Sequence, residues 1–343
     1  MTKRGCAAIG IAASCALAIG LVGPAPAAAD ASPSCDVTPR TSLVVNVKDM
    51  GAKGDGKTND TNAIRRAIQK VAGTGGMVYV PKGVYLVDTV KKRLSLGSDM
   101  TFKLADGAVL KAIPTGSQRY SVLMVQGISQ VNITGGTLLG DRKEHKGKGG
   151  EWGMGIRIAG DARHITIAGV SATHMWGDGF YVSGASDIRF CGVNADQNRR
   201  QGLSIISATN VLVRDSIFQN THGTAPASGI DLEPDKRSTG IANIRIENNQ
   251  FIDNQGDGLM VSGKRAEIRN VKIIRNTFKG SRPILVENAP KLRQNDICYN
   301  RFITYQKQDA AGMNAYAEPV QRIVSQSGCE NSGIEIHRVT KKK

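Results

Sequence analysis

The sequence predicts an all-β solenoid built from stacked coils, because a strand-like phrase recurs along the chain at nearly regular spacing. Each copy is a glycine followed by three residues, of which the first and third are apolar. The copies are 24, 23, 27 and 29 residues apart and begin at Gly155, Gly179, Gly202, Gly229 and Gly258. Repeats of this length are typical of solenoids, in which each repeat buries its apolar face only against its neighbours.

The phrase also predicts which side chains face outward. Alternate residues of an extended strand point to opposite faces, so the apolar pair faces the interior and the residue between them faces outward. Stacked strands lie about 4.8 Å apart, and the outward residues therefore form one column: Arg157, Tyr181, Ser204, Asp231 and Met260. We expect this column to form a continuous, open polar surface and to carry the function.

A second strand-like phrase follows each copy, and the later coils turn at a polar residue two positions before a phenylalanine. The pairs are Asn249 and Phe251, Asn276 and Phe278, and Asn300 and Phe302. Asparagine tolerates the left-handed conformation that such turns need, and its amide can bond to the asparagine of the next coil. The sequence therefore predicts stacked asparagines at the turns and a core of Ile, Val and Phe.

Residues 1–29 resemble a secretory signal peptide, with Lys3 and Arg4 before an apolar run and small residues up to Ala29. A membrane anchor is the alternative, but the run is short and is followed by prolines. We therefore expect an exported protein, periplasmic or extracellular, with no membrane insertion after signal cleavage. Residues 30–43 form a lead-in segment, and residues 44–343 form one elongated domain.

The net charge of +16, or +14 without Lys3 and Arg4, indicates an anionic partner. Nucleic acid is the usual partner of a basic protein, but export argues against it and aromatic residues are only 5% of the chain, too few for base stacking. An acidic polysaccharide or an anionic envelope surface fits better. No feature of the sequence decides the oligomeric state.

Four cysteines follow the signal segment: Cys35, Cys191, Cys298 and Cys329. They allow three pairings, of which we favour Cys298 with Cys329, because this bond would close the last coil. Four unpaired thiols are the alternative, which export disfavours. No cysteine–histidine cluster predicts zinc, and no cofactor is expected. Calcium binding by Asp178 or Asp257 would lack a dense ligand motif.

The start of the domain has a mixed pattern. We expect a strand at Leu43–Val47, a loop at Asp49–Asn59, a helix with its N-cap at Asp60 or Thr61, and strands at Met77–Val80 and Val84–Val87. The loop matches the phosphate-loop pattern GxxxxGK[ST] over residues 51–58. We reject nucleotide binding, because Asp55 would place a carboxylate where the phosphates lie.

The segments Asn46–Thr61 and Gly76–Tyr85 resemble the opening of the pectate lyase-like superfamily. The superfamily contains polygalacturonases, rhamnogalacturonases, pectate lyases, uronan epimerases and phage tailspikes. The resemblance implies a single-stranded right-handed parallel β-helix with a short N-terminal capping helix, and a carbohydrate substrate. It does not specify the reaction, because one scaffold carries hydrolysis, elimination and epimerisation.

The polygalacturonase residue set is incomplete in this chain. Asp178-Gly179 matches the end of that family's Asn-Thr-Asp-Gly turn. However, Arg200-Gln201 stands where a pair of aspartates is expected, and Ala227-Ser-Gly229 where Gly-His-Gly is expected. Catalytic roles therefore have to be argued from this chain's own residues.

Two acidic residues are the main catalytic candidates. Asp231 and Glu233 are two apart on one strand, so both point outward with Cα atoms about 6.5–7 Å apart. Glycoside hydrolysis needs one carboxylic acid and one carboxylate, with carboxyl groups about 5–9.5 Å apart. Asp178 is a third candidate. The alternative is structural, namely that these acids pair with Arg199 and Arg200 to tie the coils together.

Other polar and aromatic residues are candidate substrate ligands. Trp152 and Trp176 fall in adjacent coils and could stack on sugar rings, the alternative being a hydrophobic cluster beneath a loop. Arg199, Arg200 and Gln201 would bind acidic or hydroxyl groups, and Arg157 lies on the outward column. A further polar stretch is Gly140–His145, with Glu151 beyond it.

Two other functions stay open. A lyase or C5-epimerase needs a base and a cation at the uronate carboxyl, for which Tyr181, His174, His222 and the arginines are suitable types. A histidine on a loop is, however, more often simply exposed. A non-catalytic polysaccharide-binding or envelope-assembly protein would keep the tryptophans and the basic surface without an acid pair.

Overall fold

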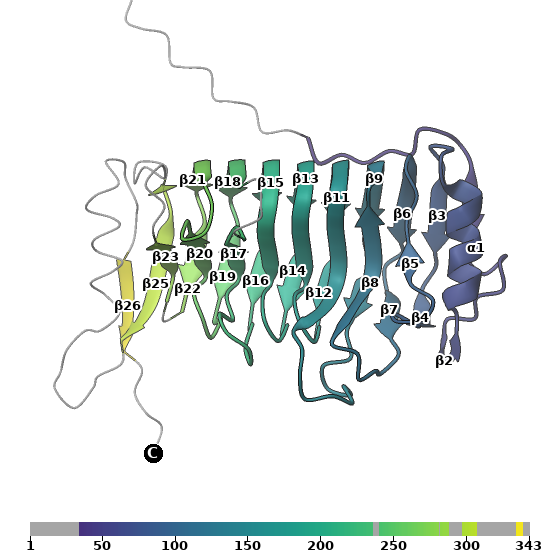
Figure 1. Ribbon diagram of the computed structural model, residues 1–343, viewed down its shortest axis with the longest axis horizontal. Coiled ribbons are helices and arrows are strands. Elements are labelled where there is room, and N and C mark those ends of the chain that lie inside the picture. Colours follow the sequence, from purple (N-terminus) through teal and green to yellow (C-terminus); the bar gives the residue numbers. More distant parts are fainter. Residues whose placement is uncertain (1–33, 236–239, 281, 288–296, 307–333, 339–343) are drawn as a thin grey trace, which may run out of the picture. The chain divides into compact units, whose positions relative to one another are not determined.

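The computed structural model describes residues 34–235, 240–280, 282–287, 297–306 and 334–338. Within these ranges the chain has one helix, α1 (Thr61–Val71), and 26 strands. Cys35–Lys343 form one unit, and Figure 1 shows its successive strands side by side from α1 to β26. The strands pair in parallel, as predicted from the repeat.

The strands form three rows, which we call the first, second and third faces. Strands β11, β13 and β15 are long enough to take part in both of the first two faces, so these form one branched 15-stranded sheet. The first face contains β5 (Leu94–Ser95), β8 (Arg119–Gln126), β11 (Trp152–Ala168), β13 (Phe180–Cys191), β15 (Leu203–Arg214), β17 (Ile230–Leu232), β20 (Leu259–Ser262) and β23 (Ile284–Glu287).

The second face continues from the same long strands, and the third face is a separate sheet of 11 strands. The second face adds β1 (Val44–Asn46), β3 (Met77–Val80), β6 (Met100–Leu104), β9 (Ser129–Thr134), β18 (Ile241–Glu247), β21 (Ile268–Ile274) and β24 (Ile297–Cys298). The third contains β2 (Asp55–Asn59), β4 (Gly83–Val87), β7 (Ala108–Ala112), β10 (Thr137–Leu139), β12 (Ser171–Thr173), β14 (Asn194–Asp196), β16 (Ile217–Gln219), β19 (Gln250–Ile252), β22 (Thr277–Lys279), β25 (Arg301–Gln306) and β26 (Ile334–Arg338).

Strand β11 shows how one strand serves two faces. Residues 152–159 pair with β8, and residues 163–168 pair with β9. The bend between the halves uses left-handed backbone at Gly160 and Asp161, whose φ angles are 64° and 63°. The corner therefore depends on residue types that tolerate positive φ.

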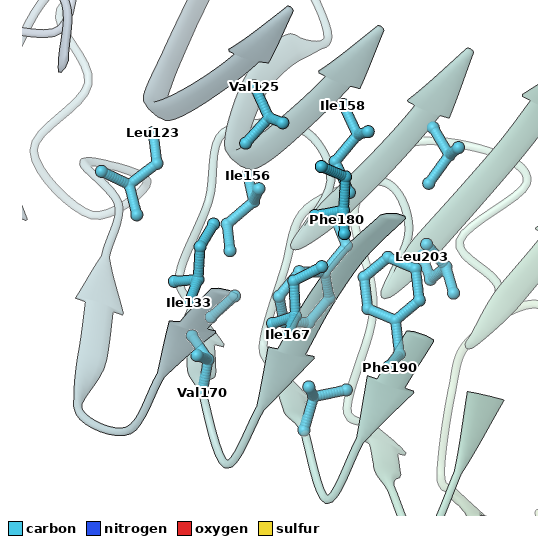
Figure 2. Close-up of a cluster of buried hydrophobic side chains, with 14 of the residues drawn as sticks. Leu123, Val125, Ile133, Ile156, Ile158, Ile167, Val170, Phe180, Phe190 and Leu203 are labelled. Carbon is cyan, nitrogen blue, oxygen red and sulfur yellow. The ribbon is translucent and has the colours of Figure 1, made fainter. Parts of the chain in front are cut away.

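The interior of the coils is apolar and closely packed. Figure 2 shows branched aliphatic side chains from adjacent coils meeting in the centre, among them Ile156, Ile167 and Leu203. Further along the chain, phenylalanines stack from coil to coil, with ring centroids 5.5 Å apart for Phe218–Phe251 and 4.5 Å apart for Phe251–Phe278. The predicted core of Ile, Val and Phe is confirmed.

The asparagine turns are confirmed, with one correction to their backbone. The Asn249 side chain donates to Asn276 Oδ1 at 3.0 Å, and the Asn276 side chain donates to Asn300 Oδ1 at 3.0 Å. The left-handed residues are the preceding ones, Asn248 and Arg275 among them. The buried asparagines therefore bond between coils, and the left-handed conformation belongs to their neighbours.

The N-terminal helix is confirmed, but the expected loop at Asp49–Asn59 ends in strand β2. Asp60 precedes α1 and does not cap the helix with its side chain. Its carboxylate instead accepts the backbone N–H groups of Lys53 and Gly54 at 2.7 and 3.0 Å. Asp60 therefore holds one part of the Gly-rich segment, and Asp55 holds another by accepting the backbone N–H groups of Lys57 and Thr58 at 2.9 and 2.8 Å.

A disulfide joins Cys35, in the lead-in segment, to Cys191 at the end of β13. Cys298 is also disulfide-bonded, while Cys329, its expected partner, lies outside the described residues. The expected signal segment lies outside them as well. In the part of the chain that the structure describes, no helix has the length and apolar character needed to cross a membrane.

Candidate active site

The strand register confirms the predicted column on the first face. Arg157 lies beside Tyr181, Tyr181 beside Ser204, Ser204 beside Asp231, and Asp231 beside Met260. The expectation of an open polar surface is wrong, because Ser204 and Asp231 have no exposed surface and Tyr181 is only 6% exposed. Pointing away from the coil interior therefore does not make these side chains accessible.

Asp178 is joined across the coils to Arg200. Asp178 lies in the turn that leads into β13, and Arg200 lies in the equivalent turn of the next coil. Arg200 Nη1 donates to Asp178 Oδ2 at 3.2 Å, and Ser204 Oγ donates to the same oxygen at 3.0 Å. Burial raises the pKa of Asp178 to about 6, while the Arg200 charge opposes that rise. Asp178 is therefore mostly ionised at neutral pH.

Asp231 lies one coil further along and has a different environment. Its Oδ2 accepts a hydrogen bond from Gln201 Nε2 at 2.9 Å, and Gln201 Oε1 accepts from the Ser228 backbone N–H at 2.8 Å. Asp231 Oδ1 is buried without a hydrogen-bond partner among the described atoms. Burial first, and then the nearby Glu233 charge, raise the pKa of Asp231 to about 8. Asp231 is therefore mostly protonated at neutral pH.

Glu233 and Glu151 complete this group of charges, which we call the carboxyl cluster together with Asp178, Asp231 and Arg200. Glu233 directly follows β17 and is half-buried. Glu151 Oε2 lies 3.5 Å from Arg200 Nε. The cluster thus combines Asp231, whose pKa lies above 7, with Asp178, whose pKa lies below 7, which is the combination that acid–base chemistry needs. It also contains the Asp178–Arg200 pair, which is expected if these acids serve to tie the coils together.

The two tryptophans lie in adjacent coils, as predicted, but they make different contacts. The Trp176 ring stacks on His145, with centroids 3.9 Å apart, and the Arg199 guanidinium lies 3.9 Å from its centroid. Trp152 meets Tyr181 edge-on at 5.9 Å. Trp176 and Arg199 therefore contact each other, and Trp152 lies beside the outward column. Sugar stacking by the tryptophans and ligand binding by Arg199 stay predictions.

The structure does not bring the two histidines to the carboxyl cluster. His174 directly follows β12, and its Nδ1 lies 2.6 Å from Thr173 Oγ1. Burial lowers the pKa of His174, which makes it neutral at pH 7. His222 is exposed, with its Nδ1 2.7 Å from the Asn220 carbonyl oxygen. Both lie in turns that follow third-face strands, and neither has a hydrogen bond to the carboxyl cluster among the described contacts.

Sequence reasoning missed a buried group that anchors the segment between β10 and β11. Asp141 accepts hydrogen bonds from Tyr120 and from the Thr115 backbone N–H, the latter at 3.0 Å, and lies 2.8 Å from His145 Nδ1. Burial, followed by the Asp141 charge, raises the pKa of Tyr120 well above its usual value. The polar stretch Gly140–His145 was the available signal, but its partners come from residues more than 20 positions away.

The carboxylates considered for calcium are bonded to arginines. Asp178 is bonded to Arg200, and Asp257 accepts from Arg282 at 3.1 and 2.9 Å. Among the residues that the structure describes, no group of three or more His, Cys, Asp or Glu side chains has a metal-binding arrangement.

Two protein-family models match the chain. The family described as "Rhamnogalacturonase A/epimerase, pectate lyase-like" matches residues 44–97, and the family described as "Right handed beta helix region" matches residues 153–338. The second match covers more than half of the 343 residues. The two matches correspond to the opening segments and to the repeated phrases of the sequence.

Relatives that match parts of the chain include proteins from Bacillus subtilis and Azotobacter vinelandii. Uncharacterized protein YclG of Bacillus subtilis is 28% identical over 275 residues, which cover 66% of this chain and 46% of YclG. Mannuronan C5-epimerase AlgE4 of Azotobacter vinelandii is 32% identical over 152 residues, which cover 39% of this chain and 27% of the epimerase. The chain therefore spans less than half the length of either relative.

Two solved structures are similar in fold. The surface protein and adhesin PfbA of Streptococcus pneumoniae has a TM-score of 0.59 at 18% identity, covering 88% of this chain and 87% of PfbA. An exopolygalacturonase from Thermotoga maritima has a TM-score of 0.54 at 15% identity, covering 78% of this chain and 82% of the enzyme. At these identities the likeness concerns the fold alone. The two family-model matches, over residues 44–97 and 153–338, show that the chain belongs to the pectate lyase-like right-handed β-helix proteins.

Proposed function

We propose that this protein is an exported enzyme that cleaves an anionic polysaccharide by glycoside hydrolysis. The observation that carries the proposal is the buried Asp231 carboxyl, whose Oδ1 has no hydrogen-bond partner among the described atoms and whose pKa is raised to about 8 by burial and by the Glu233 charge. A general acid must hold its proton at the working pH and have a free oxygen to donate it. Asp231 would protonate the leaving oxygen, and Glu233 would activate water or attack the sugar.

Asp178 and Arg200 would have a positioning role. Arg200 is bonded to Asp178, and its positive charge also opposes the rise in the pKa of Asp231. Ser204 bonds to Asp178 and occupies the column position beside Asp231. This arrangement would hold an ionised carboxylate and a guanidinium close to the acid. Asp231 has no exposed surface, so the proposal requires its cover to open when substrate binds.

The substrate class is supported by charge and by relatives. A mature charge of +14 favours anionic partners. One relative is named a mannuronan C5-epimerase and one structural neighbour an exopolygalacturonase, and both names refer to acidic polysaccharides. Export is supported by the signal-like residues 1–29 and by the Cys35–Cys191 disulfide, since such bonds persist in oxidising compartments.

A lyase or C5-epimerase is the second candidate, and the 32% identity to the epimerase over 152 residues favours it. Such an enzyme needs a base at the carbon beside the uronate carboxyl. Burial raises the pKa of Tyr181, which makes its phenolate a poor choice at neutral pH. A non-catalytic binding protein is the third candidate, since PfbA, named an adhesin, has a similar fold.

Product analysis on a panel of acidic polysaccharides tests the proposal. Hydrolysis releases reducing ends without new absorbance near ~235 nm, whereas elimination leaves an absorbing unsaturated uronate, because only elimination forms a C4–C5 double bond. We expect Asp231→Asn and Glu233→Gln each to lower turnover at least ~100-fold. Asp161→Asn, an exposed acid at the corner of β11, is the matched control and should keep full activity. Full turnover in both site variants would refute the assignment.

A further inference from the structure

A pocket of about 240 Å³ lies on the first face, on the N-terminal side of the carboxyl cluster. It lies over β8 and the first half of β11, and Arg93, just before β5, forms one end. The other side chains that matter here are Arg119, Arg157, Gln126 and Trp152. The nine residues that line the pocket include no aspartate or glutamate.

The three arginines give this pocket an uncompensated positive charge. None of them takes part in an ion pair among the described residues, whereas Arg200 and Arg282 elsewhere on the molecule are paired with aspartates. Arginine remains charged at any working pH, and its planar fork matches the two oxygens of a carboxylate. The pocket is therefore prepared for an anionic group from outside the chain.

An aromatic ring stands beside these charges. The Arg119 guanidinium lies 4.8 Å from the Trp152 ring centroid, and Arg157 Nη1 donates to Gln126 Oε1 at 3.1 Å. These contacts hold two of the arginines in defined positions without using all of their donors, since a guanidinium has five N–H groups. Trp152 is half-buried, so part of its apolar surface stays available to a ligand.

The strand register connects the pocket to the carboxyl cluster. Arg157 lies beside Met124 on β8 and beside Tyr181 on β13, and two further strands lead through Ser204 to Asp231. Three strand spacings separate Arg157 from Asp231, which is about 14 Å along the stack. A polysaccharide chain lying along the first face would cross both places.

We infer that this pocket binds the anionic substituent of a sugar residue several positions from the bond that is cleaved. The inference rests on the proposed function and makes it more specific, because it assigns the recognition of charge to Arg93, Arg119 and Arg157. The group bound is a carboxylate of a uronic acid or a sulfate ester, both of which accept paired hydrogen bonds from a guanidinium. Trp152 packs against the same sugar ring.

Binding of size-matched oligosaccharides to the mature protein, measured by calorimetry in the Asp231→Asn background, tests this inference. The ligands are an oligouronate, the same oligomer with its carboxyl groups reduced, and a sulfated neutral oligomer. We expect the charged ligands to bind at least ~10-fold more tightly than the reduced one, since each charge-assisted pair contributes more than a neutral bond. The uronate and the sulfated oligomer distinguish the two sources of charge.

Arginine variants locate the binding. Arg119→Gln with Arg157→Gln should weaken oligouronate binding at least ~10-fold and reduce its salt dependence. The matched control is Arg163→Gln, which changes an exposed arginine on the second-face half of β11 and should leave affinity unchanged. Equal affinity of the double variant and the parent, or of the charged and reduced ligands, would overturn the inference.

The two proposals fail in different ways. If the arginine variants bind normally while Asp231→Asn abolishes turnover, the pocket assignment is wrong and the hydrolase proposal stands. If the arginine variants lose binding while the parent protein yields no product from any bound ligand, the pocket assignment stands and the hydrolase proposal is wrong.

Discussion

Arg200 joins Asp178 across two neighbouring coils in an ion pair that is almost fully enclosed. Arg200 Nη1 lies 3.4 and 3.2 Å from the two carboxylate oxygens, the Asp178 side chain has no exposed surface, and that of Arg200 is 14% exposed. Such a pair contributes little net stability by itself, but removing one partner leaves a buried charge unpaired.

Replacing Arg200 by glutamine should therefore lower the free energy of unfolding by about 3 kcal/mol at pH 7. The pKa of Asp178 would rise further above about 6, because the Arg200 charge opposes the effect of burial. Urea unfolding checks the value. In an Asp178→Asn background the same substitution should cost much less. Arg265→Gln is the control, since Arg265 and its partner Asp235 are both about half-exposed and the change should cost under about 1 kcal/mol.

The raised pKa of Asp231 predicts a pH-dependent stability. Between about pH 4, its ordinary pKa, and about pH 8, its folded pKa, the folded protein binds one proton that the unfolded chain releases. The contribution of Asp231 to stability is therefore complete below pH 4 and is lost as the pH rises toward 8. The contribution of Asp178 to stability is also lost as the pH rises, but that loss is complete near its folded pKa of about 6.

Asp231→Asn isolates this effect. From pH 6 to pH 8 the variant should gain about 2 kcal/mol of unfolding free energy relative to the parent, since one pH unit corresponds to about 1.4 kcal/mol. Denaturant unfolding at the two pH values measures the difference. A constant difference between variant and parent across this range would show that Asp231 is already ionised in the folded protein.

The buried asparagine stack should contribute strongly to the free energy of unfolding, although its members are polar. Asn276 accepts from the Asn249 side chain and donates to Asn300 and to the Ile246 carbonyl oxygen, so its removal leaves several buried groups unpaired. Asn276→Ala should cost about 3 kcal/mol. Asn194→Ala, a half-buried strand residue on the third face, should cost about 1 kcal/mol or less. Equal losses in thermal unfolding would contradict this explanation.

The segment between β10 and β11 should depend on Tyr120. Its hydroxyl donates to Asp141, which also holds His145. Tyr120→Phe removes one bond from a buried carboxylate, and we expect a loss of about 1–3 kcal/mol with faster proteolysis or hydrogen exchange in residues 142–150. Tyr79→Phe, a tyrosine on β3 outside this group, is the control. Unchanged exchange in residues 142–150 would mean that other contacts hold the segment.

Local pattern was sufficient for the solenoid, because period-two alternation and the coil spacing are properties of neighbouring residues. The column from Arg157 to Met260, the helix after Asp60 and the strand at Met77–Val80 were all predicted on that basis. The same pattern placed Asp178, Arg200, Gln201 and Asp231 in adjacent coils, which the strand register confirms.

Only the tertiary structure determined the burial, the pKa and the contacts of each of these side chains. Asp231 was expected on a polar outer surface, yet it has no exposed surface, and burial raises its pKa to about 8. The Tyr120–Asp141 contact and the Arg93–Arg119–Arg157 pocket each join residues more than 20 positions apart. Strand alternation determines which way a side chain points, but burial, charge and partners depend on loops whose paths the repeat does not encode.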